Sequence, residues 1–280
     1  MNTSGGATAA STALNYPLIA IADLHGQHRE LERLVSKLEV LPAWNDCALV
    51  FLGDYVDRTR GVKETVELVL QLLARPAGGT AVMGNHDLAL VRAAGLDGGE
   101  PSEYWTQRYR TNYDHDFTFK SYLGRRPSHG KSWREELDAL KAAMPATHRD
   151  FLGTLKWVAE APGHLFLHCG LSPDLEATAE QQVAALHAKR WERPLVKPRP
   201  ETNTFQKWVD DYPVWIGADK SLSESPLAYP GKVQVTGHRP VEKPEVNTIR
   251  IRLDTSGGFG YPTAALLMSA TAEPVFISAL

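Results

Sequence analysis

The chain has 280 residues, a formal net charge of −3 and 22% charged residues, a balance typical of an ordinary globular protein. A slightly acidic chain lacks the broad basic surface that nucleic-acid binding requires, so we expect no nucleic-acid partner. Its two cysteines, Cys47 and Cys169, lie in apolar stretches typical of strands, which predicts free thiols and a reducing, cytoplasmic location.

The first fifteen residues are small and polar, without the charged start and apolar centre of a signal peptide. We predict a disordered tail over residues 1–15. No apolar run reaches the roughly 20 residues that a transmembrane helix needs, so no membrane partner is expected. Because no long low-complexity linker divides the remainder, we expect residues 16–280 to form a single domain.

Strand and helix patterns alternate over the first third of the chain. Apolar runs predict strands at 17–22, 47–53 and 80–84, and apolar residues at helical spacing predict helices at 28–41, 62–74 and 86–95. The first of these helices places Leu31, Leu34 and Leu38 on one face. Repetition of strand and helix at this length predicts an α/β fold with a largely parallel sheet.

The middle of the chain has a different pattern. Residues 95–150 are polar, aromatic and irregular, and become helical only near 135–144, which predicts an insertion over the strand ends. A further helix is expected at 148–160, with Phe151, Leu155 and Val158 on one face. The last part predicts a helix near 180–191, a proline-rich loop to about residue 230, and strands at 164–170, 232–237, 249–254, 264–270 and 274–280.

Polar clusters follow directly on five of the predicted strands. They are Asp23-Leu-His25-Gly26, Gly53-Asp54-Tyr-Val-Asp57-Arg58, Gly84-Asn85-His86-Asp87, His168-Cys-Gly170 and Gly237-His238. In an open α/β sheet, ligands bind in the crevice beyond the carboxyl ends of the strands. We therefore expect segments that are far apart in sequence to deliver these polar side chains to one place.

The residue types predict a pair of metal ions. Aspartate, histidine and asparagine without a thiolate suit manganese, iron or zinc, and the paired Cys or His ligands of a structural zinc site are missing from the sequence. Asp54 can reach both ions with its two oxygens. Two ions about 3.5–4 Å apart can hold a bridging hydroxide and clamp a phosphoryl group during in-line attack. The expected ligands are Asp23, His25, Asp54, Asn85, His168 and His238, and the expected cofactor is two divalent ions, manganese before iron or zinc.

The ordered clusters resemble those of the calcineurin-like metallophosphoesterases, and more narrowly the phosphoprotein phosphatase superfamily in its bacterial members. That superfamily carries G-D-x-H-G, G-D-x-V-D-R-G, G-N-H-E, H-G-G and a late histidine in this order, and all five blocks occur here between Asp23 and His238. The resemblance implies a four-layer αββα sandwich with a dinuclear site at one sheet edge. The departures are Ala22 before Asp23, Asp87 in place of glutamate, the extra residues of Thr59-Arg60-Gly61, and Cys169 in place of glycine or alanine.

A narrower resemblance is to the Rhizobiales-like phosphatases of bacteria and plants. It is carried by GNHD at 84–87, TFKSYLG at 118–124, LKAAMPATHRDFLGTLKWV at 140–158, LHCGL at 167–171 and DTSGGFG at 254–260. Members of that group resemble Ser/Thr phosphatases in sequence yet favour phosphotyrosine, so the resemblance implies the same preference here.

The resemblance also implies three roles around the metal ions. His86 would be the general acid that protonates the leaving oxygen, and Asp57 would hold its ring. Arg58 would grip the non-bridging phosphate oxygens with its planar guanidinium group. We thus expect a cytoplasmic metal-dependent phosphomonoesterase whose substrate is a phosphorylated protein or a small phosphoester, with direct attack of the hydroxide and no phosphoenzyme.

Other functions remain open on the sequence. A diadenosine tetraphosphate hydrolase shares these motifs, and a non-catalytic scaffold could keep the fold without turnover, although no ligand or acid is missing here. Seven aromatic residues could line a phosphoaryl pocket or form a small core of the insertion; they are Tyr104, Trp105, Tyr109, Tyr113, Phe117, Phe119 and Tyr122. Arg190 and Arg193 could add a second phosphate clamp or be solvated charges at a helix end.

The remaining histidines have plain structural interpretations. His28 and His187 lie on expected helices and should be solvated, and exposure is the default expectation for His115, His129 and His148 in the insertion. His164 is expected in a turn. Cys169, beside the expected ligand His168, should be a buried, inert thiol.

Overall fold

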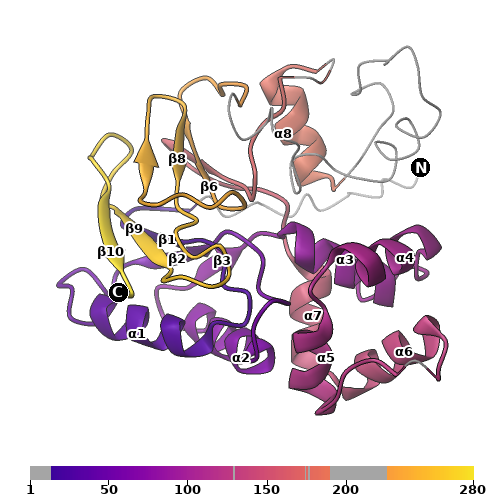
Figure 1. The fold of residues 1–280 in the computed structure, drawn as a ribbon. Coiled ribbons are helices and arrows are strands. Elements are labelled where there is room, and N and C mark those ends of the chain that lie inside the picture. Colours follow the sequence, from indigo (N-terminus) through magenta and orange to yellow (C-terminus); the bar gives the residue numbers. More distant parts are fainter. Residues whose placement is uncertain (1–13, 129, 174, 176, 190–225) are drawn as a thin grey trace, which may run out of the picture.

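Two five-stranded sheets form the centre of the computed structural model, which describes residues 14–128, 130–173, 175, 177–189 and 226–280 (Figure 1). The first sheet has the order β10-β9-β1-β2-β3. Strands β1, β2 and β3 are parallel, whereas β9 is antiparallel to β1 and β10 is antiparallel to β9. Its strands are β1 (Leu18–Ile21), β2 (Ala48–Phe51), β3 (Gly79–Ala81), β9 (Thr263–Leu267) and β10 (Val275–Ser278).

The second sheet has the order β4-β5-β6-β8-β7. Strands β5, β6 and β8 are parallel, and the edge strands β4 and β7 are antiparallel. Four of the eight described strand pairs are parallel, so the expectation of a largely parallel sheet holds for β1-β2-β3 and for β5-β6-β8 but not for the other pairs. Its strands are β4 (Ala159–Ala161), β5 (His164–Phe166), β6 (Val233–Thr236), β7 (Glu245–Val246) and β8 (Arg250–Arg252).

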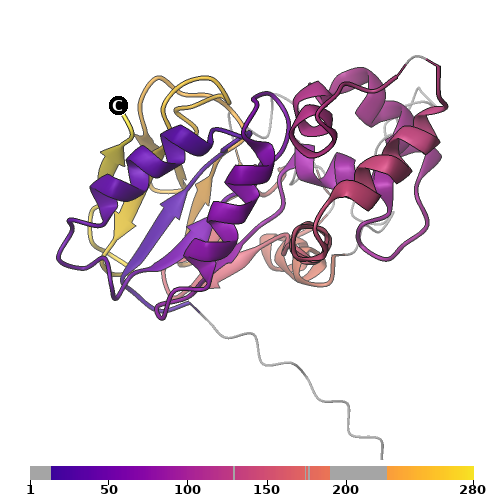
Figure 2. The same cartoon turned by 90° about the horizontal axis from the view of Figure 1, so that it is seen from below.

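Alternation of side chains along the strands creates the layers. In β1, Leu18 and Ala20 pack into a core shared with the second sheet, whereas Ile19 and Ile21 face a core that includes residues of helices α1 (His28–Leu38) and α2 (Val62–Leu73). Helix α8 (Ala179–His187) packs on the opposite face of the second sheet. Figure 2 shows α1 and α2 lying across the first sheet. The four-layer αββα sandwich is confirmed.

Residues 95–150 are more regular than expected. They form α4 (Glu103–Asn112), α5 (Asp116–Leu123) and α6 (Trp133–Ala143), which gather with α3 (Asn85–Ala94) and α7 (Ala146–Thr154) at one end of the sandwich (Figure 2). Side-chain caps start two of these helices, since Ser102 accepts from the backbone N–H of Trp105 and Ser132 accepts from that of Glu135. The aromatic, polar composition hides the helical period of α4 and α5, so the expectation of an irregular segment was wrong there, whereas the helix expected near 135–144 is confirmed as α6.

The expected helix at 148–160 was also wrong in its second half. Helix α7 ends at Thr154, and Lys156 then bridges to Val82 before β4 pairs with β5. Leu155 and Val158 are buried, but they lie outside any helix. Strand pairing supplied by the rest of the fold therefore overrides the local helical spacing.

Several smaller expectations can be compared with the fold. His164 opens strand β5 and is buried, so the expectation of a turn residue was wrong. Neither cysteine is in a disulfide bond and both are buried, as expected. None of the described helices combines the length and hydropathy needed to cross a bilayer. Some expectations concern residues outside the described part of the chain. They are those for residues 1–13 of the predicted tail and for His129, Arg190 and Arg193.

Candidate metal centre

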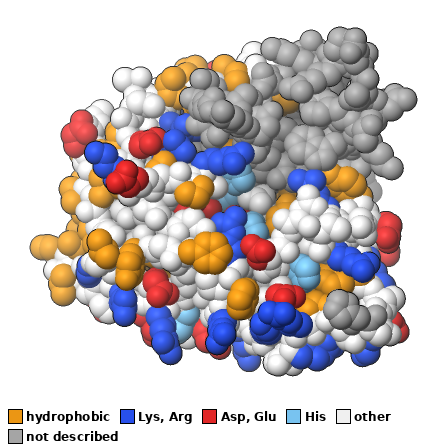
Figure 3. Space-filling model, viewed as in Figure 1, with side chains coloured by type: hydrophobic (Ala, Val, Ile, Leu, Met, Phe, Trp, Pro, Cys, Tyr) orange, Lys and Arg blue, Asp and Glu red, His pale blue; other side chains and the backbone are white. Residues whose placement is uncertain are grey.

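The six expected ligands converge at the carboxyl ends of strands from both sheets. Those that follow β1, β2 and β3 come from the first sheet, and those that follow β5 and β6 come from the second. The loops that carry them are joined by backbone hydrogen bonds: Leu24 and His25 donate to the carbonyl of Asp54 at 3.0 and 2.8 Å, and Gly237 donates to that of His168 at 3.0 Å. Figure 3 shows histidine and basic side chains gathered at the centre of this face.

Asp54 lies at the middle of the cluster. Its Oδ2 is 3.3 Å from Nε2 of His25 and 3.5 Å from Nε2 of His168, while its Oδ1 accepts the backbone N–H of His86 at 2.9 Å. This carboxylate belongs to two groups of potential ligand atoms. Within each group, all the atoms lie within 4.8 Å of one another. The groups are His25, Asp54 and His86 on one side and Asp54, His168 and His238 on the other.

Asn85 and Asp23 complete the surroundings of the second group. Oδ1 of Asn85 is 2.8 Å from Nδ1 of His238 and 3.2 Å from Nε2 of His168, so these atoms point toward a common centre. The carboxylate of Asp23 accepts the backbone N–H of His238 at 3.0 Å. Asp23 belongs to neither group of ligand atoms, although it contacts the same loop.

Backbone carbonyls fix the rings of two histidines. Nδ1 of His25 donates to the carbonyl of Val56 at 2.9 Å, and Nδ1 of His168 donates to that of Leu52 at 2.7 Å. Because these carbonyls only accept, both rings present Nε2 toward Asp54, as ligating histidines do. Nε2 of His25 is buried and makes no hydrogen bond. A buried nitrogen without a hydrogen bond, surrounded by carboxylate, imidazole and amide donors, fits a divalent cation.

Burial and the interactions between carboxylates and histidines set the electrostatics of the centre. Burial, reinforced by Asp254, raises the pKa of Asp23 to about 7. Burial also opposes ionisation of Asp54, but His168, His86 and His25 hold the pKa of this carboxyl well below its usual range. For His168, burial lowers the pKa, yet Asp54 and Asp23 outweigh it and raise the value to about 10. Three buried carboxylates so close together need compensating positive charge, which bound cations would provide.

The backbone at the centre is strained. Among the described non-glycine residues, six have positive φ, and only Lys189 lies away from the centre. Left-handed backbone costs roughly 1–2 kcal/mol at each such residue and concentrates at functional sites. The other five are His25 (41°), Asp54 (56°), Asp57 (69°), Arg58 (62°) and His238 (68°).

Two glycines allow the loops of the centre to approach closely. A Cβ on Gly84 would lie 2.1 Å from Oδ1 of Asp54, and a Cβ on Gly237 would lie 2.0 Å from Oδ1 of Asp23. Either methyl group would displace an expected ligand, so these positions require glycine.

The expected acid and phosphate contact lie beside the cluster. Nδ1 of His86 is bound to Oδ2 of Asp57 at 2.8 Å, and Nε2 of His86 lies 3.4 Å from Nη2 of Arg58. The other guanidinium nitrogen, Nη1, donates to the carbonyl of Gly257 at 2.9 Å, which fixes the direction of the side chain. Burial lowers the pKa of His86, against the opposite effect of Asp54 and Asp57. The structure thus places all nine predicted site residues around one centre.

The sequence as a whole matches the family model described as calcineurin-like phosphoesterase, over residues 16–257. The chain belongs to this family. The four-layer fold and the strand-end centre are those of a calcineurin-like phosphoesterase, with candidate ligands for a dinuclear divalent metal site.

Solved structures share the fold at low sequence identity. One is a protein assigned as a diadenosine tetraphosphatase (TM-score 0.54, 18% identity, 93% of this chain and 92% of that chain). Another is a cold-active protein tyrosine phosphatase (TM-score 0.53, 19% identity, 94% of this chain and 80% of that chain). In sequence, the serine/threonine-protein phosphatase PP1-delta of Caenorhabditis elegans is 38% identical over 76 residues, which cover 27% of this chain and 24% of that protein.

Two buried carboxylates contribute to the centre of this family member although the sequence did not single them out. Asp87 accepts the backbone N–H groups of Asp54, Tyr55 and Gly84 at 2.7, 2.9 and 2.9 Å, so it shapes the loop that carries the central ligand. Asp254 accepts the N–H of Gly257 at 2.8 Å, and its Oδ2 is buried without a hydrogen bond. The sequence signal that could have identified these two carboxylates is their position in the motifs GNHD at 84–87 and DTSGGFG at 254–260.

The aromatic residues of the insertion mostly pack into the main core. Four of them, Trp105, Tyr109, Tyr113 and Phe119, are buried in the same hydrophobic cluster as residues of β1, α1 and α2, so they extend the main core and do not form a separate small core. Tyr113 also meets the ring of His86 edge to face, with centroids 4.7 Å apart. His148 is fully buried between Tyr122 and Glu67, so its expected exposure was wrong. His187 is 41% exposed at its side chain, as expected for a solvated residue.

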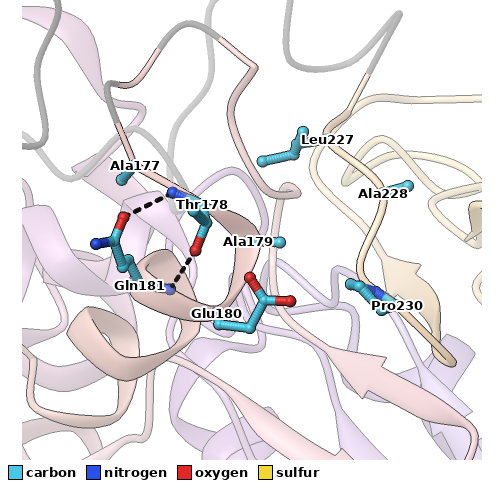
Figure 4. A pocket seen from close by; sticks show the side chains of 8 residues that line it. All are labelled: Ala177, Thr178, Ala179, Glu180, Gln181, Leu227, Ala228 and Pro230. Atoms are coloured by element: carbon cyan, nitrogen blue, oxygen red, sulfur yellow. Dashed lines mark hydrogen bonds between the residues drawn. The ribbon is translucent and has the colours of Figure 1, made fainter.

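Two pockets lie outside the cluster itself. One, of about 540 Å³, lies between the segment that starts at Gly26 and the loop Thr59-Arg60-Gly61, which differs from the family pattern. The other, of about 480 Å³, lies at the start of α8, where Thr178 and Gln181 cap each other (Figure 4). None of the nine predicted site residues lines either pocket, so the chemistry belongs to the strand ends rather than to these hollows.

Proposed function

We propose that this chain is a metal-dependent phosphomonoesterase of the cytoplasm that acts on phosphorylated proteins or small phosphoesters. The observation that carries the proposal is the sharing of Asp54 by two ligand groups, beside a His86–Asp57 pair and an arginine. The proposed ligands of two divalent ions, manganese before iron or zinc, are Asp23, His25, Asp54, Asn85, His168 and His238. When bound, the ions would supply an activated water and positive charge for the phosphoryl oxygens.

The side chains supply the remaining chemistry. Arg58 binds the non-bridging phosphate oxygens, because its guanidinium lies beside His86 and is held by the carbonyl of Gly257. A water oxygen forms a new bond to phosphorus while the bond to the leaving oxygen breaks. The proton on Nε2 of protonated His86 passes to that leaving oxygen, and a proton of the attacking water is released to solvent. Asp57 stabilises the charged ring of His86 before the transfer.

Carboxylates and imidazoles can attack phosphorus themselves, so direct attack by water is favoured because those of this centre are engaged by their neighbours. The two oxygens of Asp54 contact His25, His168 and the backbone N–H of His86, and Oδ2 of Asp57 binds the ring of His86. The nearby thiol of Cys169 is buried, with 2% of its surface exposed. No phosphorylated enzyme intermediate should therefore accumulate. Trapping of such an intermediate during turnover would contradict this mechanism.

The substrate class is the finer part of the proposal. The narrow resemblance to the Rhizobiales-like phosphatases supports a preference for phosphotyrosine, and the likeness to the cold-active tyrosine phosphatase is one of fold alone. Symmetrical diadenosine tetraphosphate hydrolysis is the second candidate, because the diadenosine tetraphosphatase fold aligns along 92% of its length. A non-catalytic scaffold is less favoured, since every expected ligand and the acid are present.

The test uses purified full-length protein loaded with Mn²⁺. We expect about two equivalents of metal by elemental analysis and hydrolysis of p-nitrophenyl phosphate. Phosphotyrosyl peptide, phosphoseryl peptide and diadenosine tetraphosphate, compared by kcat/KM, then separate the substrate classes. A metal-loaded protein without activity on any of these esters would overturn the proposal and support the scaffold.

A further inference from the structure

The carboxylate of Asp57 receives more hydrogen bonds than its pairing with His86 requires. Its Oδ2 binds Nδ1 of His86 at 2.8 Å, whereas its Oδ1 accepts two hydroxyl groups. Tyr109 donates to Oδ1 at 2.7 Å, and Thr118 donates to it at 2.6 Å. Tyr109 lies on α4 and Thr118 on α5, so both hydroxyls come from the helical insertion rather than from the sheets.

The insertion also fixes the backbone at this point. The hydroxyl oxygen of Thr118 accepts the backbone N–H of Asp57 at 3.0 Å while its proton goes to the carboxylate of the same residue. The next N–H along the chain, that of Arg58, donates to the carbonyl of Asp114 at 3.3 Å, between the two helices. Asp57 and Arg58 both have left-handed backbone, so these bonds hold a conformation that their own sequence disfavours.

Burial strengthens the hydrogen bonds that Tyr109 and Thr118 donate to Asp57 and shields them from water. Asp57, Tyr109 and Thr118 are completely buried, and hydrogen bonds to a charged carboxylate are roughly twice as strong as neutral ones. Burial, with the adjacent Asp57 carboxylate, raises the pKa of Tyr109 well above its usual range. The phenol therefore keeps its proton and acts only as a donor to Asp57.

We propose that Tyr109 and Thr118 are positioning residues for catalysis, which hold Asp57 so that it presents His86 to the leaving oxygen. This inference rests on the proposed phosphomonoesterase function. It assigns a role to the insertion, because α4 and α5 supply the hydroxyl groups that hold Asp57 beside His86. Both side chains are fully buried, so neither is exposed to contact a substrate.

A purely structural role predicts something different. Two hydroxyls could simply satisfy a buried carboxylate, and their loss would then lower stability or damage the whole centre. Loss of positioning impairs only proton donation. Esters whose leaving group needs a proton, such as phenyl phosphate, should suffer, whereas p-nitrophenyl phosphate leaves readily as the anion.

The experiment compares Tyr109→Phe and Thr118→Val with wild type on these two esters, at saturating Mn²⁺. We expect kcat for phenyl phosphate to fall about 10-fold or more and kcat for p-nitrophenyl phosphate to fall about 3-fold or less. KM and metal content should stay unchanged. Thr118→Ser, which restores the hydroxyl, should recover the activity on phenyl phosphate.

Tyr122→Phe is the matched control, because it removes a phenol of the same insertion that bonds to His148 instead of Asp57. It should lower both rates equally or not at all. Equal loss on the two esters in Tyr109→Phe, loss of metal, or no loss would overturn the positioning role. If wild-type protein hydrolyses neither ester, the proposed function itself fails, which is a separate result.

Discussion

The strand-end centre and the helical insertion are built on opposite principles. At the centre, five site residues have left-handed backbone and several charged groups are buried, which local preferences disfavour. In the insertion, helices begin at capping residues such as Ser102 and Ser132, and α5 ends at Gly124 with φ 70°. Its apolar faces pack into the main core through residues such as Leu137 and Leu140.

This difference indicates where function and stability reside. The strained loops between strands carry chemistry and persist because two sheets hold them from both sides. The insertion obeys local rules and should contribute mainly to stability, apart from the two hydroxyls that reach Asp57. Substitutions at the centre should therefore affect catalysis far more than folding, and those in the insertion the reverse.

The largest effect should follow Asp54→Asn, because Asp54 lies in both ligand groups. The amide keeps the shape but loses the charge that both ions share. We expect metal affinity to fall by about 100-fold or more and activity to be lost with it. Elemental analysis and p-nitrophenyl phosphate assays measure both. Asp138→Asn, at an exposed position of α6, is the control and should bind metal normally.

His86→Asn should separate chemistry from metal binding. The expected result is normal metal content with turnover slower by about 100-fold or more, because the general acid is lost. His187→Asn serves as the control for loss of a histidine away from the centre. His86 also lies in one group of potential ligand atoms, with His25 and Asp54. If His86→Asn lost as much metal as Asp54→Asn, His86 would be a metal ligand and not the general acid.

In the insertion, Leu140→Ala should lower the free energy of unfolding by about 2–5 kcal/mol, because Leu140 is fully buried and a cavity would remain. Denaturant titration measures this loss. At temperatures where the variant stays folded, kcat should match wild type. A large fall in kcat in the folded variant would contradict the division between the two regions.

Ser132→Ala tests the local rules of the insertion. Ser132 and Glu135 bond to each other's backbone N–H groups at the start of α6. Loss of this cap should lower the free energy of unfolding by about 1 kcal/mol, whereas Ser132→Thr should retain it. Thermal unfolding of the three proteins gives the comparison, and equal midpoints would show that tertiary packing alone starts the helix.

The smallest effect is a pH dependence on strand β4. Burial opposes ionisation of Glu160, but Lys232 and His187 outweigh it and lower the pKa of its carboxyl below the usual 4.5. A carboxyl group whose pKa is lower in the folded than in the unfolded protein stabilises the fold at a pH above its unfolded-state pKa. This stabilisation is lost as the pH falls through the folded-state pKa. Glu160→Gln should therefore lower the free energy of unfolding by about 1 kcal/mol or less at pH 7, and the difference from wild type should disappear in acid.

Much of the centre could be predicted because its signals are local. Each polar cluster directly follows an apolar strand, so the ligand candidates from Asp23 to His238 could be chosen by chemistry and position alone. The structure brings all of them to one place. The family resemblance supplied the sandwich and the roles of His86, Asp57 and Arg58, which periodicity could not.

The sequence by itself determined where most strands lie along the chain, the set of polar side chains at their ends and the glycines that let them approach. Only the tertiary structure decided that two sheets contribute to the centre and which ring nitrogen each histidine presents, because these depend on carbonyls such as those of Leu52 and Val56. It also brought Tyr109 and Thr118 to Asp57 across 52 and 61 residues of chain. Contacts at such separation leave no local pattern, since they form only when packed helices meet the strand ends.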